Sequence, residues 1–363
     1  IMDSLVVSNV QQRPTRTAVS ILGVALGVVL VLIFVGLVNG MQHSRAQRDS
    51  NVGADIMFCR EFSLTTTSLS LPTQYQAELN KVPGVTVTTP VGQYLKESKN
   101  GIGFEILEGI DFPSYAKMSG ITMKVGQPLQ NELDVIVDED YAKHKKVTVG
   151  SEIELFNRKF KVSGIYQPES GARIKINLAS MQEILSSPER CTVIYVKGTD
   201  SESQASLAKK IDTALPGNKI MPMEDLLQLY ENGIPAFNQF LKVVVGLAII
   251  VSLLVVLLAM YTTITERTRE IGILKSLGAS KAFIIREIEQ EALLICALGV
   301  VVGFLFSFLL KVGITKFTSL QVELEPRWML YAALIGLSSG LLGALYPALR
   351  AANQDPVDAL SYE

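Results

Sequence analysis

The stretch TAVSILGVALGVVLVLIFVGLVNGMQHS, residues 17–44, contains no Asp, Glu, Lys or Arg and consists mainly of apolar side chains. A helix needs about 20 such residues to cross the ~30 Å hydrocarbon core of a bilayer. Three further windows share this composition, at residues 243–265, 292–310 and 328–349. Buried helices of soluble proteins are usually shorter than this. The sequence therefore predicts four transmembrane helices.

The distribution of charge separates these windows from the rest of the chain. Charged residues make up 19% of the 363 residues, below the ~25% of an ordinary soluble domain. All of them lie outside the four windows. In the remainder of the chain, the frequency of charged residues is that of a water-facing protein. This pattern excludes a plain soluble enzyme, a disordered chain and a disulfide-rich secreted scaffold. A net charge of −2 gives no basic footprint for nucleic acid.

The spans divide the chain into one helix, a large polar domain and three further helices. The expected fold is a membrane protein of four transmembrane α-helices, with a large mixed α/β extracytoplasmic domain inserted between the first and second. The expected segments are an N-terminal interfacial helix (1–16), the first span (17–40), the α/β domain (41–222), a stalk helix (223–242), the second span (243–265), a cytoplasmic loop (266–291), the third span (292–310), an extracytoplasmic loop (311–327), the fourth span (328–349) and a cytoplasmic tail (350–363).

With four spans, both termini share one side of the membrane with the 266–291 loop. Cytoplasmic loops carry an excess of Lys and Arg. The segments on the side of the termini hold Arg13, Arg16, Arg267, Arg269, Lys275, Lys281, Arg286 and Arg350, whereas the 311–327 loop holds Lys311, Lys316 and Arg327. Basic residues near the membrane ends of the large domain (Arg45, Arg48, Arg60 and Lys242) reduce this contrast. The charge bias favours cytoplasmic termini.

The polar domain alternates between strand-like and helix-like patterns. Strands are expected at 85–91, 134–137, 153–156, 160–165 and 192–196, with a hairpin turn at Asn157-Arg158-Lys159. Helices are expected at 73–81, 139–144 and 202–215. From residue 223 to 242 an amphipathic pattern runs into the second span and predicts a stalk helix, with Pro235 as a kink position. Its apolar side chains are Leu226, Leu227, Tyr230, Ile234, Phe237 and Phe240. A simple linker is the alternative interpretation.

Small residues recur four positions apart within the spans. Such pairs let helix backbones approach closely where the hydrophobic effect cannot drive association. The pairs are Gly23 and Gly27, Gly36 and Gly40, Gly299 and Gly303, and Gly336 and Gly340. No span carries an ionisable residue at its centre, which disfavours an ion or proton relay. The spans therefore predict a tightly packed bundle.

The 266–291 loop contains the sequence ERTREIGILKSLGASK, which places a charged cluster at the membrane edge: Glu266, Arg267, Arg269 and Glu270. Ile271, Leu274 and Leu277 are expected on one face of a short helix, with Gly278 as its C-terminal cap and Ser280 capping the next helix. A short amphipathic helix at this place is either a membrane-surface anchor or a knob that fits a cytoplasmic partner.

The chain lacks the motifs of catalysis and metal binding. It contains no G-x-x-x-x-G-K-[ST], H-E-x-x-H or G-x-S-x-G sequence and no Cys/His metal spacing, and Gly101–Gly103 is interpreted as a turn. We expect no catalytic, cofactor or metal site, so any ATP must be bound by another chain. Cys59 and Cys191 both lie in the polar domain and either pair or stay free.

Several stretches resemble FtsX-like permeases of the MacB and LolC/LolE class of ABC transporters. TERTREIGILKSLGAS (265–280), followed by EALL (291–294), resembles the signature of that family. The tail YPALRAANQDPVDALSYE (346–363) resembles its ending, and NVQQRPTRTAVSILG (9–23) its entry into the first span. VGQPL (125–129), VGSEIEL (149–155) and FKVSGIY (160–166) are similar to its periplasmic core domain.

The resemblance implies a non-catalytic permease subunit in the bacterial inner membrane, working with a cytoplasmic ABC ATPase dimer that binds ATP and Mg²⁺. It implies a second permease copy, as a homodimer or heterodimer, contact with membrane lipids, and possible binding to a periplasmic adaptor. Residues 266–278, including Lys275, would be the coupling helix on the ATPase, and 41–51 with 223–242 the stalk. The resemblance implies the mechanism proposed for this family, mechanotransmission, in which ATP-driven closure of the ATPases moves the extracytoplasmic domains. The expected function is export or extraction of a drug, peptide, lipid or lipoprotein; the alternative is an FtsX-like signalling module that transmits ATPase motion to a periplasmic hydrolase without transport.

Overall fold

A computed structural model describes residues 14–60, 69–97, 104–231, 235–318 and 320–354. The chain divides into two compact units. Unit 1 consists of residues 1–41 and 235–363, and unit 2 of residues 42–234. The expected N-terminal segment before residue 14, the Gly101–Gly103 turn and the tail beyond residue 354 lie outside the described residues.

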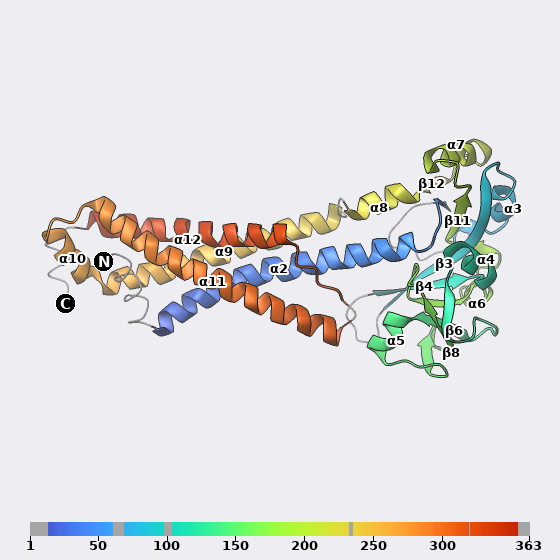
Figure 1. The fold of residues 1–363 in the computed structure, drawn as a ribbon, viewed down its shortest axis with the longest axis horizontal. Coiled ribbons are helices and arrows are strands. Elements are labelled where there is room, and N and C mark those ends of the chain that lie inside the picture. Colours follow the sequence, from blue (N-terminus) through green and yellow to red (C-terminus); the bar gives the residue numbers. More distant parts are fainter. Residues whose placement is uncertain (1–13, 61–68, 98–103, 232–234, 319, 355–363) are drawn as a thin grey trace. The chain divides into compact units, whose positions relative to one another are not determined.

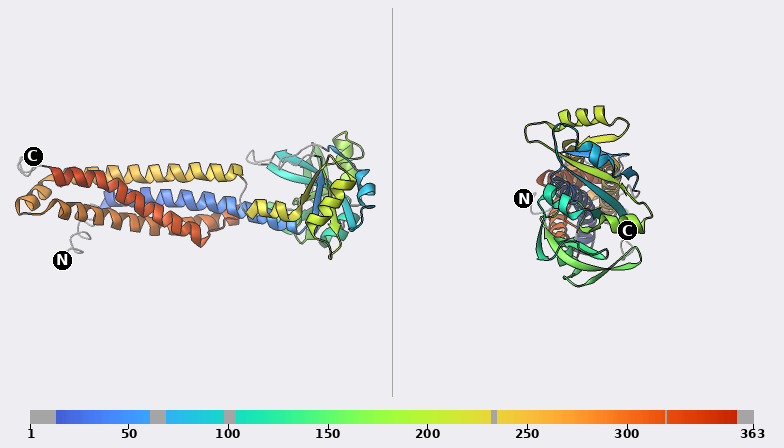
Figure 2. Two further views of the ribbon diagram at one scale, coloured as in Figure 1. Left: turned by 90° about the horizontal axis from the view of Figure 1, so that it is seen from above. Right: turned by 90° about the vertical axis from the view of Figure 1, so that its right-hand side faces the viewer.

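Unit 1 is built from long helices that run side by side (Figures 1 and 2). They are α2 (Pro14–Ser50), α9 (Pro235–Glu266), α11 (Lys281–Phe317) and α12 (Pro326–Asn353), with the short α10 (Thr268–Ser276) between α9 and α11. Within the described residues, four helices are long and apolar enough to cross a membrane, at 17–50, 238–266, 281–317 and 326–353. Each of the four predicted spans lies within one of them.

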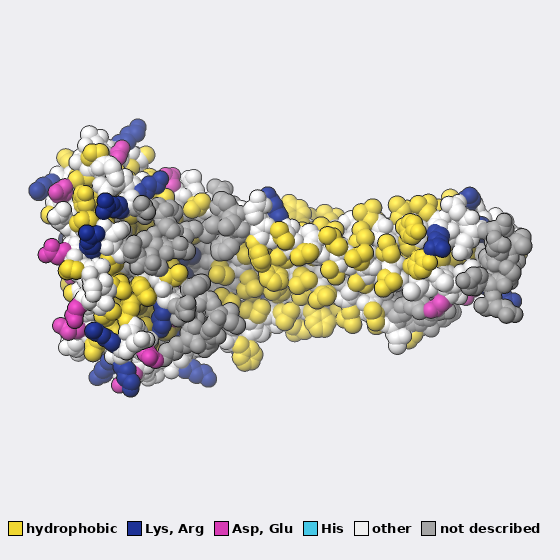
Figure 3. Space-filling model, turned by 180° about the vertical axis from the view of Figure 1, so that it is seen from behind, with side chains coloured by type: hydrophobic (Ala, Val, Ile, Leu, Met, Phe, Trp, Pro, Cys, Tyr) yellow, Lys and Arg dark blue, Asp and Glu magenta, His cyan; other side chains and the backbone are white. Residues whose placement is uncertain are grey.

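The helices of unit 1 bury small and branched side chains between them and expose large apolar ones. One buried cluster joins Val24, Val256, Ile288 and Ala344, which lie on four different helices. Leu26, Leu258, Leu309 and Leu342 point outward. In the space-filling view, hydrophobic side chains cover the visible face of the helices (Figure 3). Lipid chains solvate such a surface, so the hydrophobic effect does not hold the helices together. Close van der Waals contacts between the helices stabilise the bundle instead.

Unit 2 is a mixed α/β domain. Among the described residues ten strands form one sheet in the order β12-β1-β11-β3-β4-β9-β6-β8-β5, with β7 paired to β8, and β10 pairs separately with β2. The strands are β1 (Ile56–Cys59), β2 (Leu71–Pro72), β3 (Val85–Glu97), β4 (Phe104–Ile110), β5 (Thr122–Gly126), β6 (Asp134–Asp138), β7 (Glu152–Leu155), β8 (Arg158–Gln167), β9 (Ile174–Asn177), β10 (Arg190–Cys191), β11 (Val193–Gly198) and β12 (Lys219–Pro222).

Short helices cover this sheet, and several begin at a side-chain cap. They are α3 (Tyr75–Leu79), α4 (Phe112–Ser119), α5 (Glu139–Lys145), α6 (Leu178–Ile184), α7 (Gln204–Ala214) and α8 (Met223–Glu231). Asp111, Asp138, Asn177 and Ser203 each accept a hydrogen bond from a backbone N–H in the first turn of the following helix. These caps satisfy donors that a helix start leaves without intrahelical partners.

Each element predicted in the polar domain has a counterpart in unit 2, with shifted limits. The clearest shift is in the β7–β8 hairpin, whose two-residue loop is Phe156-Asn157 and not the expected 157–159. Both loop residues have positive φ, 51° and 57°. Two successive positive φ values are those of the turn that matches the twist of a tight hairpin, so Arg158 and Lys159 already belong to β8.

The expected stalk helix over 223–242 is divided between two helices. α8 ends at Glu231 and belongs to unit 2, whereas α9 begins at Pro235 and belongs to unit 1. Proline is favourable in the first turn of a helix, because the N–H that it lacks would have no partner there. Pro235 therefore stands as the first residue of the second membrane helix.

Candidate functional site: the α10 segment and the helices that hold it

α10 is a separate short helix with a defined start and end. It follows Arg267, and beyond its last residue Gly278 takes a φ of +96°. The Gly278 N–H donates to the carbonyl of Lys275 and the Ala279 N–H to that of Leu274, both at 3.0 Å. Glycine adopts this left-handed conformation without the steric cost of a Cβ. Ser280 then caps α11 through the Phe283 N–H, at 3.2 Å.

The charged cluster expected at the membrane edge contains one residue that holds α10 in place. The Arg267 guanidinium donates from Nε to Glu270 Oε2 at 2.7 Å and from Nη1 to Glu291 Oε2 at 3.1 Å. Glu291 lies on α11, so this ion pair fixes the start of α10 to the third membrane helix. Glu266, Arg269 and Glu270 are exposed. The four charges therefore divide into one anchor and three surface residues.

The apolar residues expected on one face of this segment differ in exposure, although Ile271 and Leu274 line the same small cavity against α9 and α11. Ile271 is 8% exposed and packs in the core of unit 1, whereas Leu274 is 39% and Leu277 is 80% exposed. Leu277 follows the last residue of α10, so its side chain no longer obeys the helical repeat. Ile273, which was not singled out, is also exposed. α10 thus presents apolar side chains outward beside Arg269.

Lys275 connects the last turn of α10 to the C-terminal end of α12. Its Nζ donates to the carbonyl of Ala352 at 2.9 Å and to that of Gln354. Nearby, Lys281 Nζ donates to Asn353 Oδ1 at 2.8 Å. Sequence reasoning placed Lys275 in the coupling segment but gave no sign of this contact, because the partners lie 77 and 79 residues further along the chain.

The predicted glycine pairs lie where backbones approach one another. A Cβ on Gly23 would come within 2.3 Å of Val255 Cγ1 on α9, and one on Gly27 within 2.1 Å of Ser252 Oγ. A Cβ on each of the other glycines would likewise contact α2, α11 or the segment before α12. The distances from that Cβ are 2.9 Å (Gly36 to Glu323 O), 2.1 Å (Gly40 to Gln321 O), 2.7 Å (Gly299 to Val24 Cβ), 2.8 Å (Gly303 to Val28 Cβ), 2.9 Å (Gly336 to Val300 Cγ2) and 2.1 Å (Gly340 to Cys296 Sγ).

One further close approach was not singled out from the sequence. A Cβ on Gly343 would lie 2.9 Å from the carbonyl oxygen of Leu253, so α12 meets α9 as well as α11. Together these positions place each of the four long helices so close to another that an added Cβ would force a neighbouring atom to shift.

The residues predicted for the stalk fall into different environments. Leu226 and Tyr230 are buried in the core of unit 2, and Leu227 packs against that core. Phe240 on α9 contacts Phe34 on α2 with ring centroids 6.0 Å apart. Phe237 lies in the first turn of α9, and Ile234 lies outside the described residues. α8 is therefore a part of the α/β domain.

A buried ion pair that the sequence did not reveal lies in the middle of the unit 2 sheet. Lys175 on β9 and Glu108 on β4 are direct partners in the parallel register, and both side chains are fully buried. Lys175 Nζ donates to Glu108 Oε2 at 2.5 Å and to the carbonyls of Ser170 and Ala172 at 2.7 and 2.9 Å. The three ammonium donors are thus satisfied, which is the condition for a tolerable buried charge.

The loop that supplies these carbonyls is also tied to the end of α2. The Gly171 N–H donates to the Arg48 carbonyl at 2.9 Å, and Arg48 Nε donates to the Gly171 carbonyl at 3.2 Å. Asn51 Nδ2 donates to the Glu169 carbonyl at 2.7 Å. Asp49 receives hydrogen bonds from Arg45 Nε at 2.9 Å and from the Tyr230 hydroxyl at 3.0 Å. The last turns of α2 are therefore built into the α/β domain.

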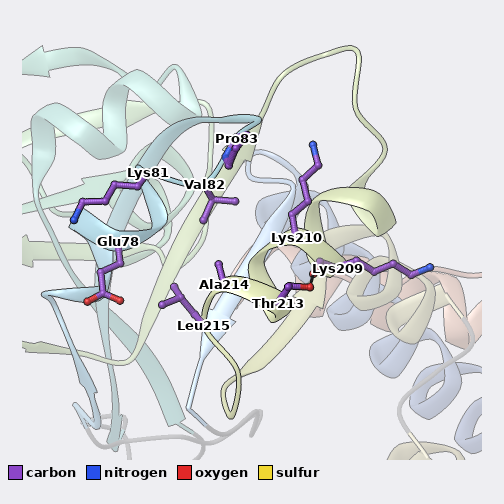
Figure 4. Close-up of a pocket in the computed structure, with 9 residues that line it drawn as sticks. All are labelled: Glu78, Lys81, Val82, Pro83, Lys209, Lys210, Thr213, Ala214 and Leu215. Atoms are coloured by element: carbon purple, nitrogen blue, oxygen red, sulfur yellow. Dashed lines mark hydrogen bonds between the residues drawn. The ribbon is translucent and has the colours of Figure 1, made fainter.

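Unit 2 also has an open surface groove of about 750 Å³ between α3 and α7 (Figure 4). Its apolar surface includes Val82 and Leu215, and Lys81 and Lys209 lie among its lining residues. Lys210, also at the groove, forms an ion pair with Glu202 at 2.6 Å. The groove belongs to unit 2, whereas all the residues predicted for ATPase coupling belong to unit 1.

Cysteines and metal-ligand types form no centre in the described part of the chain. Cys59 and Cys191 are free buried thiols, and burial raises the pKa of Cys59 to about 11 and that of Cys191 to about 12. No group of three His, Cys, Asp or Glu side chains in the described ranges is placed to hold a metal ion.

Two family models together match nearly the whole chain. The MacB-like periplasmic core domain matches residues 17–214, and the FtsX-like permease C-terminal domain matches residues 242–356. Curated relatives include the macrolide export ATP-binding/permease protein MacB of Shigella sonnei and that of Escherichia coli strain K12. Each is 25% identical over 381 aligned residues, which cover 96% of this chain and 58% of the relative. The chain thus spans little more than half the length of these relatives.

Solved structures with similarity to this chain include the periplasmic region of MacB from Actinobacillus actinomycetemcomitans, at 18% identity and a TM-score of 0.38, covering 51% of this chain and 96% of that one. The extracellular domain of the ABC-type transporter YknZ from Gram-positive bacteria matches at 12% identity and a TM-score of 0.36, covering 46% and 99%. The match over residues 17–214 alone covers more than half of the chain. The chain belongs to the MacB-type family of FtsX-like ABC transporter permeases, membrane proteins with an extracytoplasmic α/β domain between the first and second spans.

Proposed function

We propose that this chain is the permease subunit of an ABC transporter and that α10 is the element through which a cytoplasmic ATPase acts on it. The observation that carries the proposal is the outward face of α10. Ile273 and Leu277 are exposed beside Arg269, on a helix that is held at its start by the Arg267–Glu291 ion pair. An apolar knob with a charged neighbour is suited to a groove on a partner protein.

The proposed orientation puts α10 and both termini in the cytoplasm of the bacterial inner membrane, with unit 2 in the periplasm. The excess of Lys and Arg in the segments that share a side with α10 supports it. Two basic residues at the start of unit 2 reduce this charge bias, but both have local partners. Arg45 pairs with Asp49, and Arg48 forms hydrogen bonds with Ser44 and Gly171. These two side chains serve the fold of unit 2.

The proposed assembly is a dimer of permease chains with two ATPase subunits, which bind ATP and Mg²⁺ on separate chains. Closure of the ATPases draws the two α10 helices together and moves the extracytoplasmic domains. Close glycine contacts between the four long helices support this mechanism, because a tightly packed bundle transmits a rigid-body movement. The proposed outcome is export or extraction of a substrate outside the membrane, with a periplasmic adaptor as a further partner.

The test compares two residues of similar exposure at opposite ends of unit 1. Leu277 is 80% and Phe317 is 84% exposed. Leu277→Glu is expected to abolish copurification of the ATPase and its stimulation by the permease, whereas Phe317→Glu leaves both as in the unaltered protein. Full retention of binding and stimulation in Leu277→Glu would refute the assignment of α10 as the contact.

A further inference from the structure

The C-terminal end of α12 is stabilised by a side chain that comes from α10. The last four carbonyls of a helix have no intrahelical partner, and they carry the negative end of its dipole. Lys275 places its ammonium group at this end and donates to the carbonyls of Ala352 and Gln354. A cation in this position is favourable because it donates to carbonyls that lack partners and because it interacts with the negative end of the helix dipole.

Apolar packing accompanies this polar contact. Ala348, Ala351 and Ala352 are buried in the cluster that also contains Ile271 of α10 and Ile284 of α11. Small side chains on this face let the last turns of α12 lie close to both helices. Arg350, in the last turn of α12, donates from Nη1 to the Tyr261 hydroxyl of α9 at 2.9 Å. The end of α12 is therefore in contact with α9, α10 and α11.

α10 has polar attachments at its two ends, each to a different membrane helix. At its start, Arg267 pairs with Glu291 of α11. Near its end, Lys275 binds α12. A helix held at one point can pivot, whereas a helix held at two points on different elements moves only with them.

We propose that Lys275 is a positioning residue that joins α10 to α12, so that a displacement of α10 by the ATPase is transmitted directly to the fourth membrane helix as well as to the third. This inference rests on the proposed function of α10. Lys275 acts here through helix α12 and not through contact with the ATPase.

The experiment separates binding of the ATPase from its stimulation. The variant Lys275→Met keeps the aliphatic stem and removes the ammonium donors, and Lys275→Arg keeps a cation with several donors. Lys281→Met is the matched control, since Lys281 donates to the side chain of Asn353 in the last turn of α12 and not to a backbone carbonyl in the described part of the chain. The affinity of the purified permease for its ATPase and the permease-dependent rate of ATP hydrolysis are measured for each variant.

We expect Lys275→Met to bind the ATPase within twofold of the unaltered protein and to lose at least fivefold of the permease-dependent stimulation. Lys275→Arg is expected to restore most of this loss, and Lys281→Met to remain within twofold of the unaltered protein. Lys275→Gln, which keeps a shorter neutral donor, provides a second variant and is expected to lose stimulation like Lys275→Met.

Two results would overturn the inference. Unchanged stimulation in Lys275→Met and Lys275→Gln would show that the contact with α12 transmits nothing. A loss of binding as large as the loss of stimulation would make Lys275 a part of the docking surface. Failure of the proposed function is recognised separately, because Leu277→Glu would then also leave binding and stimulation unchanged.

Discussion

Arg267 and Glu291 lie 24 residues apart in the chain and join their side chains at 3.1 Å, from Nη1 to Oε2. Glu291 is largely buried, and its partner comes from the residue that precedes α10. The ion pair therefore fixes the start of α10 to the third membrane helix.

Removal of one partner is expected to cost more than removal of both. Arg267→Met leaves a largely buried carboxylate without its cation, which should lower the stability of the solubilised protein by about 2 kcal/mol. Arg267→Met combined with Glu291→Gln should recover most of that loss. Thermal unfolding of the three proteins measures this, and equal losses in the single and double variants would contradict the role of the ion pair.

The bundle should be sensitive to added volume at its glycine contacts. A Cβ on Gly340 would meet Cys296 Sγ at 2.1 Å, whereas one on Gly246 of α9 meets nothing within 4 Å. Overpacking of this kind typically costs about 1–3 kcal/mol. We expect Gly340→Ala to lower the unfolding temperature and Gly246→Ala to leave it unchanged. Equal behaviour of the two variants would mean that the α11–α12 approach is looser than described.

The buried pair of unit 2 gives a third prediction. Lys175→Met leaves Glu108 charged and without its ammonium partner in the middle of the sheet, and loss of one member of a buried pair costs about 3–5 kcal/mol. Glu108→Gln with Lys175→Met removes both charges and should restore most of the stability. Chemical denaturation with fluorescence detection distinguishes the variants, and a double variant no more stable than Lys175→Met would contradict this explanation.

A fourth prediction concerns pH. Burial raises the pKa of Asp138 from its ordinary 3.8 to about 6, although Arg173 and the hydrogen bond from the Tyr141 N–H oppose the shift. The nearby Glu169 carboxylate raises the pKa of Asp138 further, and the Arg48 guanidinium lowers it. Because the folded state binds this proton more tightly than the unfolded state, the stabilisation is present below about pH 4. It is lost as the pH rises through about 6.

Asp138→Asn should remove this dependence while it keeps a good helix cap for α5. Relative to the unaltered protein, the stability of the variant is expected to rise between about pH 4 and pH 7, by up to about 3 kcal/mol at ~1.4 kcal/mol per pKa unit. Unfolding curves of both proteins across this range provide the measurement. A difference between them that does not change with pH would contradict the assignment.

The membrane helices and the α/β class could be predicted from the sequence because they depend on composition and local periodicity. The windows without charge are long enough to identify the spans, alternation identified strands β7 and β8, and a short apolar run identified β6. β4 and β9 were not predicted, since each carries a charged residue, Glu108 or Lys175, at a fully buried position. Only the cross-strand partner makes such a residue compatible with a sheet interior.

The site was predictable in its location but not in its geometry. Local sequence predicted Gly278 as the left-handed residue that closes α10 and Ser280 as the N-cap of α11, and both are confirmed. How deeply each side chain is buried depends on α11 and α12, so the sequence did not predict that Leu274 is exposed and Ile271 buried, although both line the same cavity. The contact of Lys275 with α12 joins residues far apart in the chain, and no local pattern reports it.

The central claim is that the ATPase acts through α10 to move the extracytoplasmic domains. It is tested most directly by the distance between spin labels on the two unit 2 domains of the assembled dimer, with Lys159→Cys as the labelling site. Lys159 is exposed, whereas Cys59, Cys191 and Cys296 are buried, so the introduced thiol should react first. We predict that the distance distribution shifts when ATP is bound and that Leu277→Glu abolishes the shift. Identical distributions with and without ATP, in a complex that hydrolyses ATP at its full rate, would contradict the account.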